Sequence, residues 1–143
     1  MNDASASEID GLGAMFRPAD IKAADRGGGA RTIPMVSKRC GSSSMMNGIT
    51  ILNVGSAIPM HTHNCEETVM LLEGNAIAEV NGVEHILQPG DTTWIAAGVP
   101  HRFRNTSVSE PMKIFWTYAS VDATRTLVAN GETRRVDAEH GAR

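Results

Sequence analysis

Short apolar runs, each followed by a turn signal, recur along most of this chain and limit the folds open to it. From Thr32 to about Ser120 their spacing is about 8–12 residues, and Gly, Pro or Asn stands between them. Several runs alternate apolar with polar residues, as a strand with one buried face does. The runs are TIPMV, GITILNV, TVMLLE, AIAEV, HILQ, TTWIAA, HRFRN and MKIFWTYA. This pattern predicts an antiparallel all-β sandwich or barrel, closed or nearly closed.

The clearest local signal is a hairpin within this region. The runs AIAEV and VEHIL are separated by Asn81-Gly82 alone. Both residues tolerate a positive φ, which a type I′ turn requires at its two central positions. We therefore expect two paired strands here.

The two ends of the chain differ from its centre. Residues 1–30 are small and polar and end in the glycines of 27–29, so we expect a flexible N-terminal arm. The barrel should span 31–120. In the tail, 121–143, the run VDATRTLVANGETRR could form a short helix with Asp122 as its N-cap and Gly131 as its stop.

Composition matters mainly for what it excludes. The chain has 143 residues, about one domain, and its net charge of −3 comes without a basic patch that would suit nucleic acid. Its apolar stretches are far shorter than the ~18 residues of a membrane span. The N-terminus, MNDASASEIDGLG, has acidic residues where a signal peptide has basic ones. We expect a cytoplasmic protein in which Cys40 and Cys65 are free thiols.

Chemistry is concentrated in the stretch HTHNCEE. His61 and His63 are two residues apart, so on a strand their side chains share a face. Glu67 follows four residues later, and His101 opens another run, where it shares a face with Phe103. If these strands curl into one barrel, three imidazoles and a carboxylate converge inside it. Burying such a group is costly without a partner, and a divalent transition metal is the partner that suits these ligands.

Two longer motifs contain these residues, and both resemble those of the cupin family. The stretch from Gly55 to Gly74 matches the cupin pattern G(X)5HXH(X)3E(X)6G at every marked position. The stretch from Gly90 to Asn105 matches G(X)5PXG(X)2H(X)3N, except that Ala96 stands in place of proline. Since proline mainly fixes a backbone torsion, this departure should affect the rigidity of the turn more than the chemistry.

The resemblance implies a double-stranded β-helix, or jelly-roll barrel, with one divalent transition metal per chain. It implies the ligands His61, His63, Glu67 and His101, and it prefers Glu67 to Glu66, which falls in the turn between strands. The metal stays open among iron, manganese, nickel, cobalt and zinc. Four protein ligands would leave one or two coordination positions open for a substrate.

Other residues are weaker candidates. Trp94, Trp116 and Tyr118 could line the pocket as substrate contacts, although large aromatic side chains in a small barrel more often pack in the core. His85 lies between the motifs and His140 in the polar tail, and we expect neither to take part.

Two functions are compatible with these observations. The first is a metal-dependent enzyme, a dioxygenase, lyase (decarboxylase) or isomerase, acting on a small, oxygen-rich or aromatic molecule. In it Glu67 could also shuttle a proton, while no residue stands out as the general base. The alternative is a non-enzymatic barrel that binds or senses a metabolite. By analogy with other small jelly rolls we expect a homodimer, and removal of residues 1–30 should weaken it.

Overall fold

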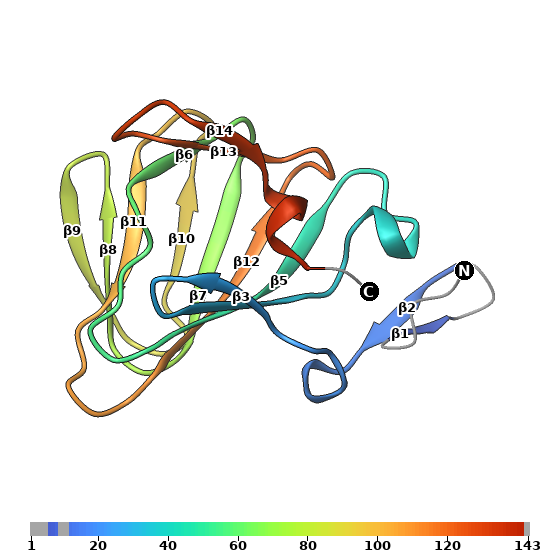
Figure 1. The fold of residues 1–143 in the computed structure, drawn as a ribbon, viewed down its shortest axis with the longest axis horizontal. Coiled ribbons are helices and arrows are strands. Elements are labelled where there is room, and N and C mark those ends of the chain that lie inside the picture. The colour runs from blue at the N-terminus through green and yellow to red at the C-terminus, as the bar shows by residue number, and fades with distance from the viewer. Residues whose placement is uncertain (1–5, 9–11, 142–143) are drawn as a thin grey trace.

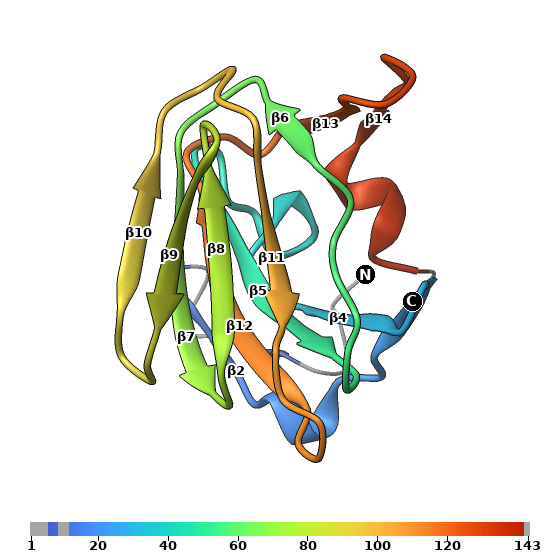
Figure 2. The same ribbon diagram turned by 90° about the vertical axis from the view of Figure 1, so that its left-hand side faces the viewer.

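Two six-stranded antiparallel sheets face each other in the computed structural model, which describes residues 6–8 and 12–141 (Figures 1 and 2). The first, the β12 sheet, consists in spatial order of β10 (Thr92–Ile95), β7 (Glu67–Glu73), β12 (Met112–Tyr118), β5 (Met46–Leu52), β4 (Ala30–Pro34) and β3 (Ala24–Gly27). The second, the β11 sheet, consists of β14 (Thr133–Arg135), β13 (Thr124–Leu127), β6 (His61–His63), β11 (His101–Asn105), β8 (Ala76–Val80) and β9 (Val83–Leu87). This arrangement confirms the expected jelly-roll barrel.

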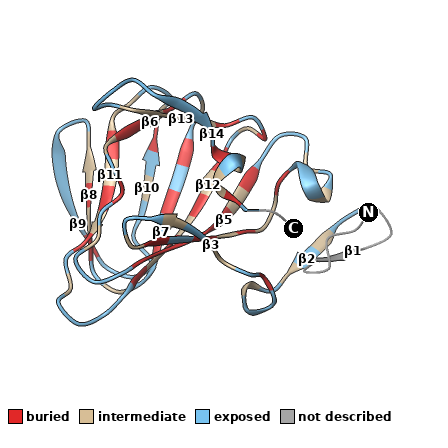
Figure 3. Cartoon of the chain, in the orientation of Figure 1, coloured by how far each residue is buried: buried red, intermediate tan, exposed pale blue. Residues whose placement is uncertain are grey.

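The core lies between the inner faces of the two sheets. Along β12 the buried residues are Met112, Ile114, Trp116 and Tyr118, and the residues between them are less buried. The same alternation brings the even-numbered face of β12 opposite the odd-numbered face of β11 (Figure 3). Each large apolar side chain buried in this way contributes about 1.5–3 kcal/mol to the hydrophobic stabilisation. The period-two pattern of the sequence therefore fixes which side chains point into the barrel.

The predicted hairpin is confirmed. β8 and β9 pair antiparallel, with Val80 opposite Val83. Asn81 and Gly82 have φ angles of 49° and 82°, as a type I′ turn requires. The hairpin places β9 at the edge of the β11 sheet.

The N-terminal segment contains more regular structure than expected of an arm. β1 (Ala6–Glu8) and β2 (Ala14–Phe16) form a separate two-stranded sheet, followed by the 3-10 helix η1 (Pro18–Asp20). β3 then pairs with β4 and so extends the β12 sheet below residue 31. The glycines at 27–29 make the tight turn of this hairpin, with φ angles of 77°, 61° and 84°. Residues 1–5 and 9–11 of the expected arm lie outside the described residues.

The helix expected between Asp122 and Gly131 does not form. Thr124–Leu127, at its centre, instead form β13, which pairs with β6 and with β14. The run contains Thr124 and Thr126, and β-branched side chains pack well on a pleated sheet, so pairing with β6 overrides the helix signals at the two ends. A short 3-10 helix, η3 (Val136–Glu139), follows later in the tail.

A third 3-10 helix, η2 (Lys38–Cys40), lies in the connection between β4 and β5. Cys40 and Cys65 are both free thiols, as expected. Within residues 6–8 and 12–141, the helices are all too short or too polar to cross a membrane.

Candidate metal centre

The histidine-rich motif lies inside the barrel, where two strands of the β11 sheet meet. His61 and His63 point inward from β6 and are 3% and 4% exposed. His101, the first residue of β11, stands directly opposite His61 in the antiparallel register. Glu67, the first residue of β7, approaches from the β12 sheet and is also buried. The four residues that the resemblance implied as ligands are therefore brought together from both sheets.

The ligand atoms of these residues lie close to one another. One ring nitrogen each from His61, His63 and His101 falls within a group whose members are at most 4.8 Å apart. The Oε1 atom of Glu67 is 3.1 Å from Nε2 of His101 and 3.5 Å from Nε2 of His63. This grouping could hold a metal ion.

Each histidine ring is oriented by a backbone carbonyl. The Nδ1 atoms of His61, His63 and His101 lie 2.6, 2.8 and 2.9 Å from the carbonyl oxygens of Pro59, Thr124 and Val99. A carbonyl can only accept a hydrogen bond, so each Nδ1 carries a proton and donates it. In a neutral ring the proton is then absent from Nε2, whose lone pair points to the centre of the group.

The electrostatics of the site keep the rings of His61 and His63 neutral. Burial, followed by the positive charge that His101 and His63 would carry, holds the pKa of His61 well below its usual range. Burial also lowers the pKa of His63, although the Glu67 carboxylate opposes this. Nε2 of His61 and Nε2 of His63 are nonetheless 3.1 Å apart. Since neither atom carries a proton, their lone pairs repel each other, and a cation between them would relieve the repulsion. The residues therefore fit a metal ion.

Two of the three aromatic candidates lie beside this group. The ring centroids of Tyr118 and His63 are 4.7 Å apart, and burial raises the pKa of Tyr118 well above its usual value, so that its hydroxyl remains protonated. Trp116 donates from Nε1 to Oγ1 of Thr50 at 2.8 Å. Gly48 makes room for this indole, because a Cβ there would lie 2.6 Å from Cζ2 of Trp116.

The third aromatic candidate lies elsewhere. Trp94 is 62% exposed on the outer face of β10 and donates to Oε1 of Glu66 at 2.9 Å. Its neighbour Ile95 takes the inward position. The structure thus brings Trp116 and Tyr118 to the site and leaves Trp94 outside, while Glu66 lies in the turn, as expected.

Sequence reasoning missed a second group of polar residues next to the histidines. His140 is 3% exposed, and its ring stacks on that of Trp116 at a centroid distance of 5.8 Å. Glu139 pairs through Oε2 with Nε of Arg26 at 2.7 Å and with Nη1 of Arg125 at 3.2 Å. The local signals of the tail, which is mostly polar, do not indicate that these side chains turn inward. The one signal in this polar run is the apolar residue Val136, which the structure shows to be buried against the barrel.

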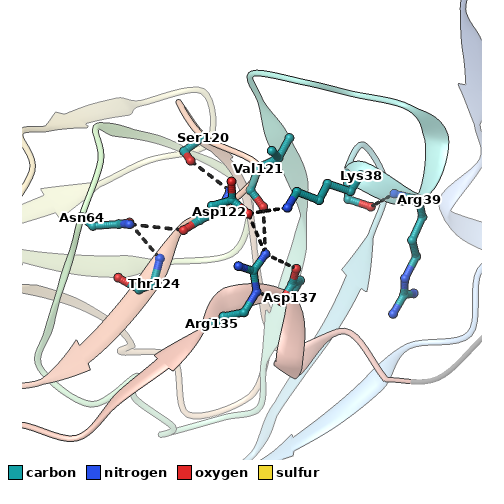
Figure 4. A network of polar contacts seen from close by, with 10 residues as sticks. Lys38, Arg39, Asn64, Ser120, Val121, Asp122, Thr124, Arg135 and Asp137 are labelled. Carbon is teal, nitrogen blue, oxygen red and sulfur yellow. Dashed lines mark hydrogen bonds and ion pairs between the residues drawn. The ribbon is translucent and has the colours of Figure 1, made fainter.

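A network of polar contacts joins the turn between β6 and β7, residues 64–66, to the C-terminal strands (Figure 4). The side chain of Asn64 donates to the carbonyl of Asp122 at 3.2 Å and accepts from the backbone N–H of Thr124 at 2.8 Å. Asp122 in turn pairs with Lys38 and with Arg135. Because Thr124 also supplies the carbonyl that orients His63, this network helps to place the ring.

Comparison with known proteins agrees with this geometry. Residues 48–118 match the Cupin_2 family model, described as a cupin domain. Protein SchB from Streptomyces halstedii is 32% identical over 91 residues, which cover 63% of this chain and 65% of SchB, just under two thirds of that protein's length.

Solved structures show the same fold at lower identity. The polyketide cyclase RemF from Streptomyces resistomycificus superposes with a TM-score of 0.68 at 18% identity, covering 85% of this chain and 84% of RemF. A salicylate 1,2-dioxygenase from Pseudoaminobacter salicylatoxidans superposes with a TM-score of 0.60 at 17% identity, covering 67% of this chain and 26% of the enzyme. At these identities the likeness shows the shared fold alone.

Proposed function

Residues 48–118 form a cupin domain, and from that premise we propose that the protein is a metal-dependent enzyme acting on a small organic molecule. The substrate is oxygen-rich or aromatic, and the reaction is of the dioxygenase, lyase or isomerase type. The proposed ligands of one divalent transition metal are His61, His63, Glu67 and His101. The protein's partner is a diffusible small molecule, and we expect neither nucleic acid nor a membrane to be bound.

One observation carries this proposal: the Nε2 atoms of His61 and His63 lie 3.1 Å apart, while the Nδ1 atom of each ring contacts a backbone carbonyl that accepts its proton in a hydrogen bond. Three backbone carbonyls hold the rings so that their lone pairs converge, and Glu67 adds a negative charge. Without a cation, this arrangement would repel itself inside a region of low dielectric constant. Histidines that only packed in a hydrophobic core would not need their lone pairs to converge in this way.

The side chains around the ligands suit chemistry on a bound substrate. A divalent metal would supply a Lewis acid with at least one open coordination position. Tyr118 keeps its proton, and its hydroxyl, which is hydrogen-bonded to Glu67, could donate to a substrate oxygen instead. Trp116, Phe103 and Ile114 line a small cavity beside the ligands and make its wall largely apolar. Glu67 could carry a proton between substrate atoms if it leaves the metal.

The solved neighbours support the choice of reaction class. A polyketide cyclase and a dioxygenase are built on this fold, and both names denote enzymes of small organic molecules. Fold alone does not determine function, so the choice between reaction types depends on the metal.

The first experiment is to measure metal content by mass spectrometry on untagged protein purified without chelator. We expect about one iron, manganese, nickel or zinc per chain, its loss in His61→Ala, and its retention in the matched control His85→Ala, since His85 is exposed on β9. Iron would direct the next assay to oxygen uptake, and manganese or zinc to isomerase and lyase screens. No metal above background after reconstitution would contradict the proposal. Metal without turnover would favour the metabolite-binding barrel.

A further inference from the structure

The cavity beside the candidate ligands is too small for an organic substrate. Its lining includes His61 and Glu67, and its volume is about 20 Å³, enough for roughly one water molecule. Arg26, Arg125, Glu139 and His140 also line it. The same side chains also line a wide cleft that opens to solvent. A substrate that enters from this cleft must therefore displace part of this group.

The group carries an excess of positive charge. Two guanidinium groups, from Arg26 and Arg125, face the single carboxylate of Glu139. All three side chains are largely buried, being 10%, 12% and 18% exposed. Both arginines reach the same oxygen, Oε2, although a guanidinium binds a carboxylate best with two parallel hydrogen bonds. Glu139 is thus an incomplete partner for the two arginines.

Several polar atoms of the group are buried without a hydrogen bond. Among the described residues these are Nε of Arg125 and both ring nitrogens of His140. Each such atom is unfavourable, because burial has removed its contact with water and no protein group replaces it. A ligand placed between the arginines and His140 would provide the missing partners.

The positions of the two arginines are well defined by the strands. Arg26 donates from Nη1 to Oγ1 of Thr32 at 3.4 Å, and Thr32 contacts Thr50, which holds Trp116. Arg125 stands opposite His63 in the pairing of β13 with β6. Glu139, by contrast, comes from the four-residue helix η3. The cations are therefore fixed to the two sheets, while the anion sits on a short segment next to them.

We propose that Arg26 and Arg125 form a binding subsite for a carboxylate of the substrate, and that Glu139 occupies this subsite until an acidic ligand replaces it. The ligand's carboxylate forms the hydrogen bonds that Glu139 leaves unmade, and His140 binds a further polar atom of the ligand. The body of the molecule then points toward His61 and Glu67. This inference rests on the proposed function for the role of the metal, but the subsite itself can be tested without metal.

The test is a calorimetric titration of metal-free protein, kept in chelator, with benzoate and with its neutral counterpart benzamide. Glu139→Gln keeps the shape of the side chain and removes its charge, so we expect it to bind benzoate at least about tenfold more tightly than the wild type. Benzamide affinity should not change. Arg125→Met should weaken benzoate binding by about tenfold or more, whereas Arg31→Met, on the exposed face of β4, should not.

The two ligands separate the possible outcomes. An equal gain for benzoate and benzamide in Glu139→Gln would mean that the change merely opens the cleft, and would overturn the proposal. Benzoate binding that is unchanged in both Glu139→Gln and Arg125→Met would also overturn it. If Arg125→Met fails to fold, the ratio of the two affinities in Glu139→Gln decides alone. Because no metal is present, failure of the metal proposal leaves this result intact.

Discussion

The three histidine rings of the candidate site owe their orientation to backbone atoms. Carbonyl oxygens of Pro59, Val99 and Thr124 accept the Nδ1 protons, so no substitution of a neighbouring side chain removes these hydrogen bonds directly. A carbonyl partner fixes both the tautomer and the angle of the ring. The ligand geometry therefore depends on the paths of β6, β11 and β13.

The stability of the protein should depend on pH through His140, because its imidazole ring is buried away from water. Burial lowers its pKa to about 4, so the folded protein keeps the ring neutral while the unfolded chain takes up a proton below about pH 6.5. The unfolded state then binds more protons, and the free energy of unfolding falls as the pH falls through this window. A shift of this size corresponds to about 3 kcal/mol by pH 4.

The variant His140→Phe keeps the ring stacked on Trp116 and cannot titrate. Chemical denaturation of metal-free protein between pH 4.5 and 6 should show a slope smaller than that of the wild type by about 1 kcal/mol per pH unit. Identical slopes in the two proteins would show that His140 is not buried as a neutral ring.

At the scale of elements, the turn between β6 and β7 is held by its contact with the start of β13. Asn64 makes both hydrogen bonds of this contact, and Thr124 passes the constraint on to His63 (Figure 4). We expect Asn64→Ala to weaken metal binding by about tenfold, as the loss of an outer partner of a metal ligand commonly does. A competition assay with a metal-binding dye measures this affinity. Asn130→Ala, in the β13–β14 turn, is the matched control, and equal loss in both variants would contradict this role of Asn64.

The same elements show how far sequence reasoning reaches. Strands β7, β11 and β12 follow from their period-two patterns, and the candidate ligand set follows from the resemblance to the two cupin motifs. Strand β13 could not be predicted in this way, because the run VDATRTLVANG carries helix signals at both ends. Its conformation is decided by pairing with β6, about sixty residues earlier in the chain. His140 was missed for the same reason, since its stacking partner Trp116 lies on another element. A local sequence pattern predicts local secondary structure, whereas these contacts join residues that are far apart in the chain.

At the scale of the whole molecule, the β1–β2 hairpin stands beside the barrel and belongs to neither large sheet (Figure 1). By analogy with other small jelly rolls we expect a homodimer that the N-terminal arm helps to hold together. A cut before Pro18 tests this more cleanly than removal of residues 1–30, because β3 and Arg26 remain in place. Sedimentation velocity should show a shift from dimer toward monomer in the shortened protein, since its contact area is lost. An unchanged dimer, or a full-length monomer, would count against the arm's role.

The four candidate ligands are divided between the two sheets, three on the β11 sheet and Glu67 on the β12 sheet. A bound ion would therefore act as a cross-link through the middle of the sandwich. The sheets could not part without breaking a coordination bond, so release of the ion and opening of the fold would become one event. The affinity for the ion would then add to the free energy of unfolding of the whole barrel, by an amount that grows with the logarithm of the ratio of the ion's concentration to its dissociation constant.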